Sequence, residues 1–191
     1  IVLSPTSGQN DTTLVVSVTA NLSTSSRTGI VVVTGGGVTR TVAVTQSGAA
    51  AVLTVTPLAL SFGAASASIP FSVFSNVHWG ASNDASWITV SPSGGSNDTT
   101  VIVTVAANPA TDSRKGTVTI TGGGLTRIVS VTQSGAPAIL SLSPPTLSYY
   151  AGSSSASFSV TANITWNVLD TLEWVTVSPS SGNHDTTVTV S

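Results

Sequence analysis

Hydrophobic and polar residues alternate along most of the chain. Residues 99–106 read T-T-V-I-V-T-V-A, while residues 116–121 and 125–133 alternate Val, Leu or Ile with Thr, Ser or Arg. A period of two places successive side chains on opposite faces and is typical of half-buried antiparallel strands. No part of the sequence shows the stripe of an amphipathic helix. The pattern therefore predicts an all-β protein.

The sequence repeats itself at an offset of 87 residues without a gap. Residues 1–49 align with residues 88–136 with 30 identical positions of 49, and the rest of the chain aligns at the same offset. Such a period indicates tandem copies of one structural unit. We therefore divide the chain into module 1 (1–50, the C-terminal part of a unit), module 2 (51–137, a complete unit) and module 3 (138–191, the N-terminal part of a unit).

Glycine and proline mark the turns between the expected strands. The glycine triplet at 122–124, repeated at 35–37, joins two strands and predicts a tight hairpin with positive backbone angles. A phosphate-binding glycine loop would be followed by a helix, whereas a strand pattern follows here. With further turns at Pro57, Pro92 and Pro109, about seven strands fit into 87 residues. We predict tandem immunoglobulin-like antiparallel β-sandwiches.

Composition excludes several classes of protein. The chain has five Lys or Arg and seven Asp or Glu, too few cations for the basic stripe that binds nucleic acid. It has no cysteine for disulfides, and it has neither an apolar run long enough to span a bilayer nor a signal peptide at its start. It also has no methionine, even at position 1, and we interpret it as an internal piece of something longer.

Three segments resemble one known family. They are W-I-T-V-S-P-S-G-G at 87–95, N-D-T-T-V-I-V-T-V-A-A-N at 97–108, and the run from 114 to 135 that ends in V-T-Q-S-G. Together with paired tryptophans eight residues apart, they resemble the Bacteroidetes-associated carbohydrate-binding often N-terminal (BACON) domain. The resemblance covers the whole chain. It implies a β-sandwich of bacterial extracellular and surface proteins, found in tandem arrays or beside polysaccharide-degrading modules.

No arrangement of residues predicts catalysis. His78 and His184 occupy different positions of the repeat unit, and no Ser-His-Asp arrangement recurs. The recurrent acid at Asp11, Asp98 and Asp185 stands alone or beside one Asn, Asn10 or Asn97, and these are too few oxygen ligands for calcium. We therefore expect no enzyme, no catalytic residue, no metal site and no cofactor.

The recurrent D-T-T segments have two readings. In the first, Asp98 and its counterparts form an Asx-type turn that satisfies nearby amides at the start of a strand. In the second, D-T-T, together with D-T-L at 170–172, resembles the sites that bacteria of the namesake phylum O-glycosylate. That reading makes four threonines candidate glycosylation sites, namely Thr12, Thr99, Thr171 and Thr186.

The aromatic residues decide the carbohydrate question. Sugar-binding sandwiches expose aromatic ring faces, so the candidate glycan contacts are Trp79, Trp166 and Tyr150. Core packing is the favoured reading for all four tryptophans, and more strongly for Trp87 and Trp174, since each precedes an apolar strand. Tyr149 aligns with Phe62 and is expected to point inward.

Four of the five cations occupy two repeated positions. Arg27 and Arg114 precede the glycine hairpin, and Arg40 and Arg127 follow it. We expect these arginines to cover apolar surface with their stems and to donate to carbonyl groups or an acid near the sheet ends.

Short linkers such as 134–138, stiffened by Pro137, predict a semi-rigid rod of sandwiches. We expect a non-catalytic structural repeat of a bacterial extracellular or cell-surface fibre or stalk. Its expected partners are neighbouring repeats or copies of itself, with no nucleic acid and no membrane insertion. The alternative is a carbohydrate-binding module of an adhesin or polysaccharide-degrading enzyme.

The two end fragments could complete each other in trans, but residues 1–17 and 175–191 would then be duplicated, so we favour a window on a longer array.

Overall fold

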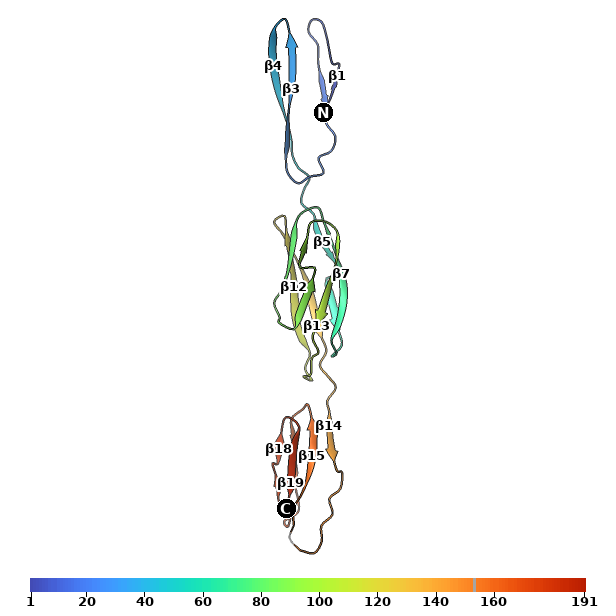
Figure 1. The fold of residues 1–191 in the computed structure, drawn as a ribbon, viewed down its shortest axis with the longest axis vertical. Coiled ribbons are helices and arrows are strands. Elements are labelled where there is room, and N and C mark those ends of the chain that lie inside the picture. The colour runs from blue at the N-terminus through green and yellow to red at the C-terminus, as the bar shows by residue number, and fades with distance from the viewer. Residues whose placement is uncertain (153) are drawn as a thin grey trace.

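The structure, a computed structural model, describes residues 1–152 and 154–191. The protein is all-β, and three β-rich bodies follow one another along the long axis, each joined to the next by one segment of chain (Figure 1). Within the described residues, no helix is long and apolar enough to cross a membrane.

Module 2 is a sandwich of two sheets. One sheet has the strand order β10-β8-β12-β13-β6 and the other has the order β5-β7-β11-β9. The strands are β5 (Leu53–Thr56), β6 (Ala59–Phe62), β7 (Ala67–Ser75), β8 (Trp79–Asn83), β9 (Ile88–Ser91), β10 (Gly94–Gly95), β11 (Thr99–Val105), β12 (Arg114–Gly122) and β13 (Leu125–Gln133).

The module contains nine strands where the sequence predicted about seven, and the difference begins at Pro57. β5 pairs antiparallel with β7 in one sheet, whereas β6 pairs parallel with β13 in the other. Proline has no N–H to donate to a ladder, so the chain leaves the first sheet at this point and enters the second. The two-residue strand β10 accounts for the other additional strand.

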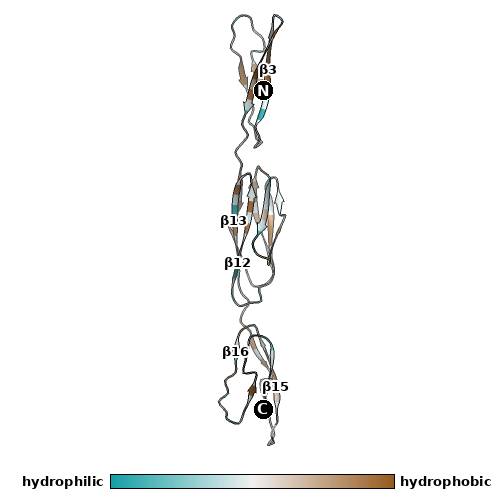
Figure 2. Ribbon diagram, turned by 90° about the vertical axis from the view of Figure 1, so that its left-hand side faces the viewer, coloured by the Kyte–Doolittle hydropathy of each residue, from teal (hydrophilic) through white to brown (hydrophobic). Residues whose placement is uncertain are grey.

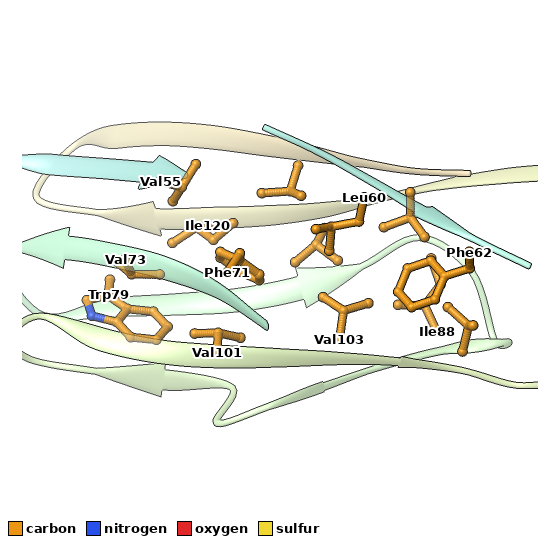
Figure 3. Packing of buried hydrophobic residues seen from close by; sticks show 14 of the residues in the cluster. Val55, Leu60, Phe62, Phe71, Val73, Trp79, Ile88, Val101, Val103 and Ile120 are labelled. Atoms are coloured by element: carbon orange, nitrogen blue, oxygen red, sulfur yellow. The ribbon is translucent and has the colours of Figure 1, made fainter. Parts of the chain in front are cut away.

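The core of module 2 lies between the two sheets (Figure 3). Alternate residues of β11 point inward, so Val101, Val103 and Val105 are fully buried while Ile102 between them stays exposed. β12 and β13 add Val118, Ile120 and other inward residues from the opposite sheet. The alternation in the sequence is therefore the alternation between core and solvent.

The glycine hairpins form as predicted. Gly122 pairs with Leu125, and the two loop residues Gly123 and Gly124 have φ of 57° and 78°. Both loop positions of such a two-residue turn require positive φ, which glycine adopts without steric cost. Gly36 and Gly37 adopt the same conformation in module 1, which confirms the prediction for both copies of the triplet.

Modules 1 and 3 contain complementary parts of this sandwich. Module 1 has two hairpins, formed by β1 (Val2–Ser4), β2 (Val15–Ser17), β3 (Arg27–Gly35) and β4 (Val38–Gln46). Module 3 has the sheet β14-β15-β19-β17 and the pair β16-β18. Its strands are β14 (Leu140–Ser143), β15 (Ala156–Ala162), β16 (Trp166–Asn167), β17 (Val177–Ser178), β18 (Ser181–Gly182) and β19 (Thr186–Val190). Strand β3 contains a hydrophobic stretch (Figure 2), and its residues Ile30, Val32 and Val33 are exposed.

Candidate functional site

Hydrogen bonds from side chains and backbone groups hold the two connections between modules. In joint 2 (residues 133–139), the side-chain amide of Asn108 donates to the carbonyl of Ser134 at 3.2 Å, and the Ala136 amide donates to the Ala110 carbonyl at 2.7 Å. These bonds attach the first half of the joint to module 2. The buried Asn108 also donates to the Asp112 carbonyl at 2.8 Å, which holds the side chain in place.

A second asparagine attaches the other half of joint 2 to module 3. The Asn163 side chain donates to the Pro137 carbonyl at 2.9 Å and accepts from the Ile139 amide at 2.7 Å. The backbone amide of Asn163 donates to the Ile139 carbonyl at 3.3 Å. Ala136 is thus bound to one module and the next residue, Pro137, to the other, so no unattached residue separates the two.

Joint 1 (residues 46–52) repeats this arrangement. Asn21 donates to Ser47 at 3.1 Å and Ala49 donates to Ser23 at 2.8 Å on the side of module 1. On the side of module 2, Asn76 donates to the Ala50 carbonyl at 2.9 Å and accepts from the Val52 amide at 2.7 Å. The same four contacts therefore recur at both joints.

A glycine in each joint permits the close approach of the backbone. A Cβ atom on Gly135 would lie 2.0 Å from the carbonyl oxygen of Thr111, and one on Gly48 would lie 2.2 Å from that of Thr24. Backbone atoms cannot rotate out of the way as a side chain can. The glycine of the V-T-Q-S-G segment is therefore required by the geometry of the joint.

The recurrent aspartate supports Asn76 and Asn163, the asparagines that attach each joint to the module that follows it. Asp98 accepts from the Ser75 amide at 2.9 Å, and Asp185 accepts from the Ala162 amide at 2.9 Å. Ser75 and Ala162 directly precede Asn76 and Asn163. The amide that each aspartate satisfies thus lies on a neighbouring strand rather than in a local Asx turn, and the bond fixes the strand end that presents the asparagine.

An arginine stacked on a tryptophan braces the end of module 2 near joint 2. The guanidinium carbon of Arg114 lies 4.4 Å from the centre of the Trp87 ring, a cation–π distance. Its Nη2 donates to the carbonyls of Ala106 at 2.7 Å and Ala107 at 3.1 Å, and its Nε donates to the side chain of Gln133 at 2.9 Å. Donation to carbonyl groups confirms the structural role expected for Arg114.

Replacing Arg114 with Lys is expected to lower the free energy of unfolding of module 2 by about 1–2 kcal/mol, because an ammonium group cannot reproduce the planar fork that bonds two carbonyls and Gln133 while stacking on Trp87. Urea denaturation followed by tryptophan emission measures the change. Arg127→Lys is the matched control, since Arg127 donates to the carbonyl of its neighbour Thr126. Equal stability of the two variants would contradict the bracing role.

Trp79 and Trp166 are more buried than Trp87 and Trp174, which is the reverse of the expectation. Trp79 and Trp166 are each 5% exposed, and their indole N–H groups donate to the carbonyls of Asn97 at 3.2 Å and His184 at 3.1 Å. Both rings pack against glycines, Gly95 and Gly182, that leave room for them. As candidate glycan contacts, Trp79 and Trp166 could therefore reach a sugar only if the core opened.

Trp87 and Trp174 are the outer pair. Trp87 is half-buried beneath Arg114, and Trp174 is 76% exposed. The residue that corresponds to Arg114 would stand ten positions beyond Ser191, so strand β12 has no counterpart within module 3. The absence of this cover explains why the expectation of a core position for Trp174 is wrong in this chain.

Tyr150 is the most exposed candidate. Its side chain is 97% exposed, and with Tyr149 and Trp174 it lines an open cleft of about 630 Å³ in module 3. Tyr149, expected to point inward, is 38% exposed, and its hydroxyl donates to the Val190 carbonyl at 3.1 Å. Its counterpart Phe62 is buried against strands that module 3 lacks.

The four candidate glycosylation threonines have different surroundings. Thr12 and Thr171 are exposed, whereas Thr99 and Thr186 are half-buried. The hydroxyls of Thr99 and Thr186 donate to the carbonyls of Asn97 at 3.0 Å and His184 at 3.1 Å. Glycosylation of these threonines stays a prediction, and Thr171 and Thr12 are the more accessible acceptors.

The charged residues that the structure describes are spread over the chain. Among residues 1–152 and 154–191, no group of three His, Cys, Asp or Glu could hold a metal ion. The pKa of Asp84 is lowered because its carboxylate accepts from both the amide and the hydroxyl of Thr117, at 2.7 and 2.8 Å. That contact ties the turn after β8 to β12 and is structural.

The asparagines that hold the two joints are residues to which the sequence analysis assigned no role, namely Asn21, Asn76, Asn108 and Asn163. The available signal was the repeat itself, since Asn21 and Asn76 recur as Asn108 and Asn163 at the offset of 87 residues.

Comparison with solved structures finds β-rich proteins. A Bacteroides ovatus GH5 xyloglucanase in complex with a XXXG heptasaccharide is 29% identical, with a TM-score of 0.43 over 46% of this chain and 20% of that one. Domains 1–6 of the surface layer protein SbsC are 22% identical, with a TM-score of 0.40 over 86% of this chain and 25% of that one. The Yersinia pseudotuberculosis adhesin InvE is 13% identical, with a TM-score of 0.31 over 74% and 51%. The chain thus spans from a fifth to about half of these proteins.

Family models match nearly the entire chain. No curated protein matches. The model described as "Viral BACON domain" matches residues 52–136 and 139–191, and a BACON model described as "Putative binding domain, N-terminal" matches residues 1–47. The boundaries between these matches fall at joint 1 and joint 2. Since the first model alone covers more than two thirds of the residues, the chain belongs to the BACON domain family.

Proposed function

We propose that the chain is a non-catalytic structural repeat that builds a stiff extracellular fibre or stalk. The observation that carries the proposal is the attachment of adjacent residues to different modules, Ala49 and Ala50 at joint 1 and Ala136 and Pro137 at joint 2. A linker with no unattached residue leaves few torsions about which neighbouring modules can bend. Stiffness is the property that a spacer needs and that a flexible tether lacks.

The polar chemistry of the joint suits this role. The bonds that attach residues 47–52 and 134–139 to the modules use asparagine amides and backbone groups. Among the joint residues, the side chains of Arg27 and Arg114 bond only to the first one, Gln46 or Gln133. Neutral hydrogen bonds keep their strength when the salt concentration changes, unlike exposed ion pairs. A rod built this way keeps its shape across the ionic conditions met outside a cell.

An extracellular or cell-surface position fits the family and the composition. Twelve charged residues in 191 leave few sites for trypsin-like proteases and little repulsion between copies. Side-by-side or end-to-end contact of copies is part of the proposal. The model that matches most of the chain is described as viral, and the placement on a bacterial surface stays a prediction.

Carbohydrate binding is the second candidate function, favoured by the exposed aromatic cleft of Tyr149, Tyr150 and Trp174. Against it, the corresponding region of the complete module has Trp87 beneath Arg114 and Phe62 in the core. The cleft thus belongs to the incomplete module. A polysaccharide panel decides between the candidates, because binding that is lost in Tyr150→Ala would favour the glycan role.

Replacing both Asn76 and Asn163 with Ala is expected to loosen both joints while the modules stay folded. Each substitution removes two side-chain hydrogen bonds worth about 0.5–1.5 kcal/mol apiece. Small-angle X-ray scattering should then show a broader range of shapes and a smaller average size than the parent chain. The control is Asn97→Ala, at an exposed position outside the joints. An unchanged scattering curve in the double variant would contradict the proposed basis of stiffness.

A further inference from the structure

The strands by which the chain enters and leaves module 2 lie side by side. Joint 1 leads into β5 and then into β6, while β13 leads out into joint 2. β6 pairs parallel with β13, which places Ala59 opposite Ser130 and Phe62 opposite Gln133. The segment that receives any load from joint 1 is therefore bound directly to the strand that passes the load to joint 2.

The directions of β6 and β13 decide how the pair meets a pull along the rod. Joints 1 and 2 lie at opposite ends of module 2 (Figure 1), so tension draws β6 towards joint 1 and β13 towards joint 2. Because the two strands are parallel, these forces act along the strands and in opposite directions. The ladder bonds cross from one strand to the other, so the pull strains all of them together instead of one after another.

Hydrogen bonds and buried side chains both oppose sliding of this pair. The Ser130 amide donates to the Leu58 carbonyl at 2.9 Å, and the Ser134 amide donates to the Phe62 carbonyl at 3.0 Å. The inward side chains of β6, Leu60 and Phe62, are buried in the core. Sliding β6 along β13 by one residue would turn both of them towards solvent. Movement along the axis therefore costs apolar burial as well as ladder bonds.

A buried glutamine reinforces the end of the pair that lies at joint 2. Gln133 is 0% exposed, and its side-chain amide donates to the carbonyls of Ala64 at 3.2 Å and Ala106 at 3.0 Å. Its side-chain oxygen accepts from Arg114 at 2.9 Å. Ala64 lies two residues beyond the end of β6. The last residue of β13 is therefore tied to the segment after β6 by its side chain as well as by the ladder.

The break between β5 and β6 at Pro57 ties the entering segment to both sheets. β5 pairs with β7 in one sheet, and β6 pairs with β13 in the other. A pull from joint 1 therefore loads both sheets at once. We infer that β6 and β13 form a mechanical clamp, which resists unfolding of the module when the chain is stretched along its axis. The inference rests on the proposed function, since a fibre or stalk under load is stretched in this direction.

Pulling module 2 in two directions tests the clamp while the same bonds are in place. The 191-residue chain has no cysteine, so handles can be attached to introduced pairs of cysteines. The axial pair is Ala50→Cys with Ala138→Cys, and the peeling pair is Ser66→Cys with Ala138→Cys, all at exposed positions. The peeling pair pulls β6 and β13 apart from their shared end, so their bonds break one at a time. Force spectroscopy at one pulling speed should give an unfolding force at least about twofold higher for the axial pair.

Two proline variants test whether the ladder bonds carry the load. Ser134→Pro removes the amide that donates to the Phe62 carbonyl. Ser61→Pro is the matched control, because β6 is the last strand of its sheet and the amide of Ser61 faces the open edge. Both serines are exposed. Ser134→Pro should lower the axial unfolding force by roughly a fifth, through the loss of one ladder bond, and Ser61→Pro should leave it unchanged.

Equal unfolding forces in the two pulling directions would overturn the clamp. An axial force that stays the same in Ser134→Pro, in a chain that urea denaturation shows to be folded, would also overturn it. If Ser134→Pro does not fold, the comparison of directions in the chain without proline substitutions still decides. Failure of the clamp leaves the stiffness of the joints untouched, because scattering measures that stiffness without load. Flexible joints together with a direction-dependent force would instead overturn the rod and leave the clamp in place.

Discussion

Replacing Trp79 with Ala is expected to lower the free energy of unfolding of module 2 by about 3–5 kcal/mol. The ring is 5% exposed, closes the core beside Val73 and Val101 (Figure 3), and donates to the Asn97 carbonyl at 3.2 Å. Its removal leaves a cavity and deletes the indole hydrogen bond, while the Asn97 carbonyl keeps the bond that it accepts from the Thr99 hydroxyl. A loss of this size is a large fraction of the net stability of a typical domain.

Urea denaturation followed by circular dichroism measures the effect. Phe74→Ala is the matched control, since Phe74 lies on the preceding strand β7 of the opposite sheet and is 45% exposed. Phe74→Ala should lower the free energy of unfolding by less than about 1 kcal/mol. If the two variants lost the same stability, Trp79 would not be a core residue and the sugar-contact reading of this position would regain support.

Gly135→Ala is expected to disrupt joint 2 and to cost about 1–3 kcal/mol. The new Cβ would lie 2.0 Å from the Thr111 carbonyl oxygen, so the joint must move away from the loop that it crosses. That movement breaks the bond from Ala136 to Ala110 and weakens the bond from Asn108 to Ser134. The modules then bend about a linker that is attached on one side only.

Thermal denaturation measures the loss of stability, and small-angle scattering measures the bending of the modules. Gly63→Ala is the control, because a Cβ on Gly63 meets no atom within 4 Å. The control should leave both measurements unchanged or raise stability slightly, since alanine restricts the unfolded chain. Retention of the parent's shape and stability in Gly135→Ala would show that the joint tolerates the displacement.

Local patterns predicted the elements of the fold well. Alternation located β11, β12 and β13, and the glycine triplets located both hairpins, because each depends on neighbouring residues. The split of β5 and β6 at Pro57 was missed, since which sheet a strand joins is decided by partners far along the chain. The offset of 87 residues supplied the tandem architecture directly.

The candidate site was harder to predict because its bonds are tertiary. Which tryptophan enters the core depends on strand position: Trp79 begins β8 and faces Gly95, while Trp87 lies in the turn before β9 and meets Arg114. Asn76 and Asn108 act through carbonyls 26 residues away. Their spacing follows no local pattern, and only their recurrence in the repeat could have indicated them.

A distance measurement across joint 2 tests the central claim, that neighbouring modules are held in a fixed orientation. The chain has no cysteine, so Ser130→Cys and Ser159→Cys would create two unique labelling sites at exposed positions of modules 2 and 3. Pulsed electron paramagnetic resonance on the spin-labelled chain should give one narrow distance distribution, which broadens when Asn163→Ala is added. A broad distribution in the parent, as wide as that of the Asn163→Ala chain, would mean that the modules are flexibly tethered and that the rod does not exist.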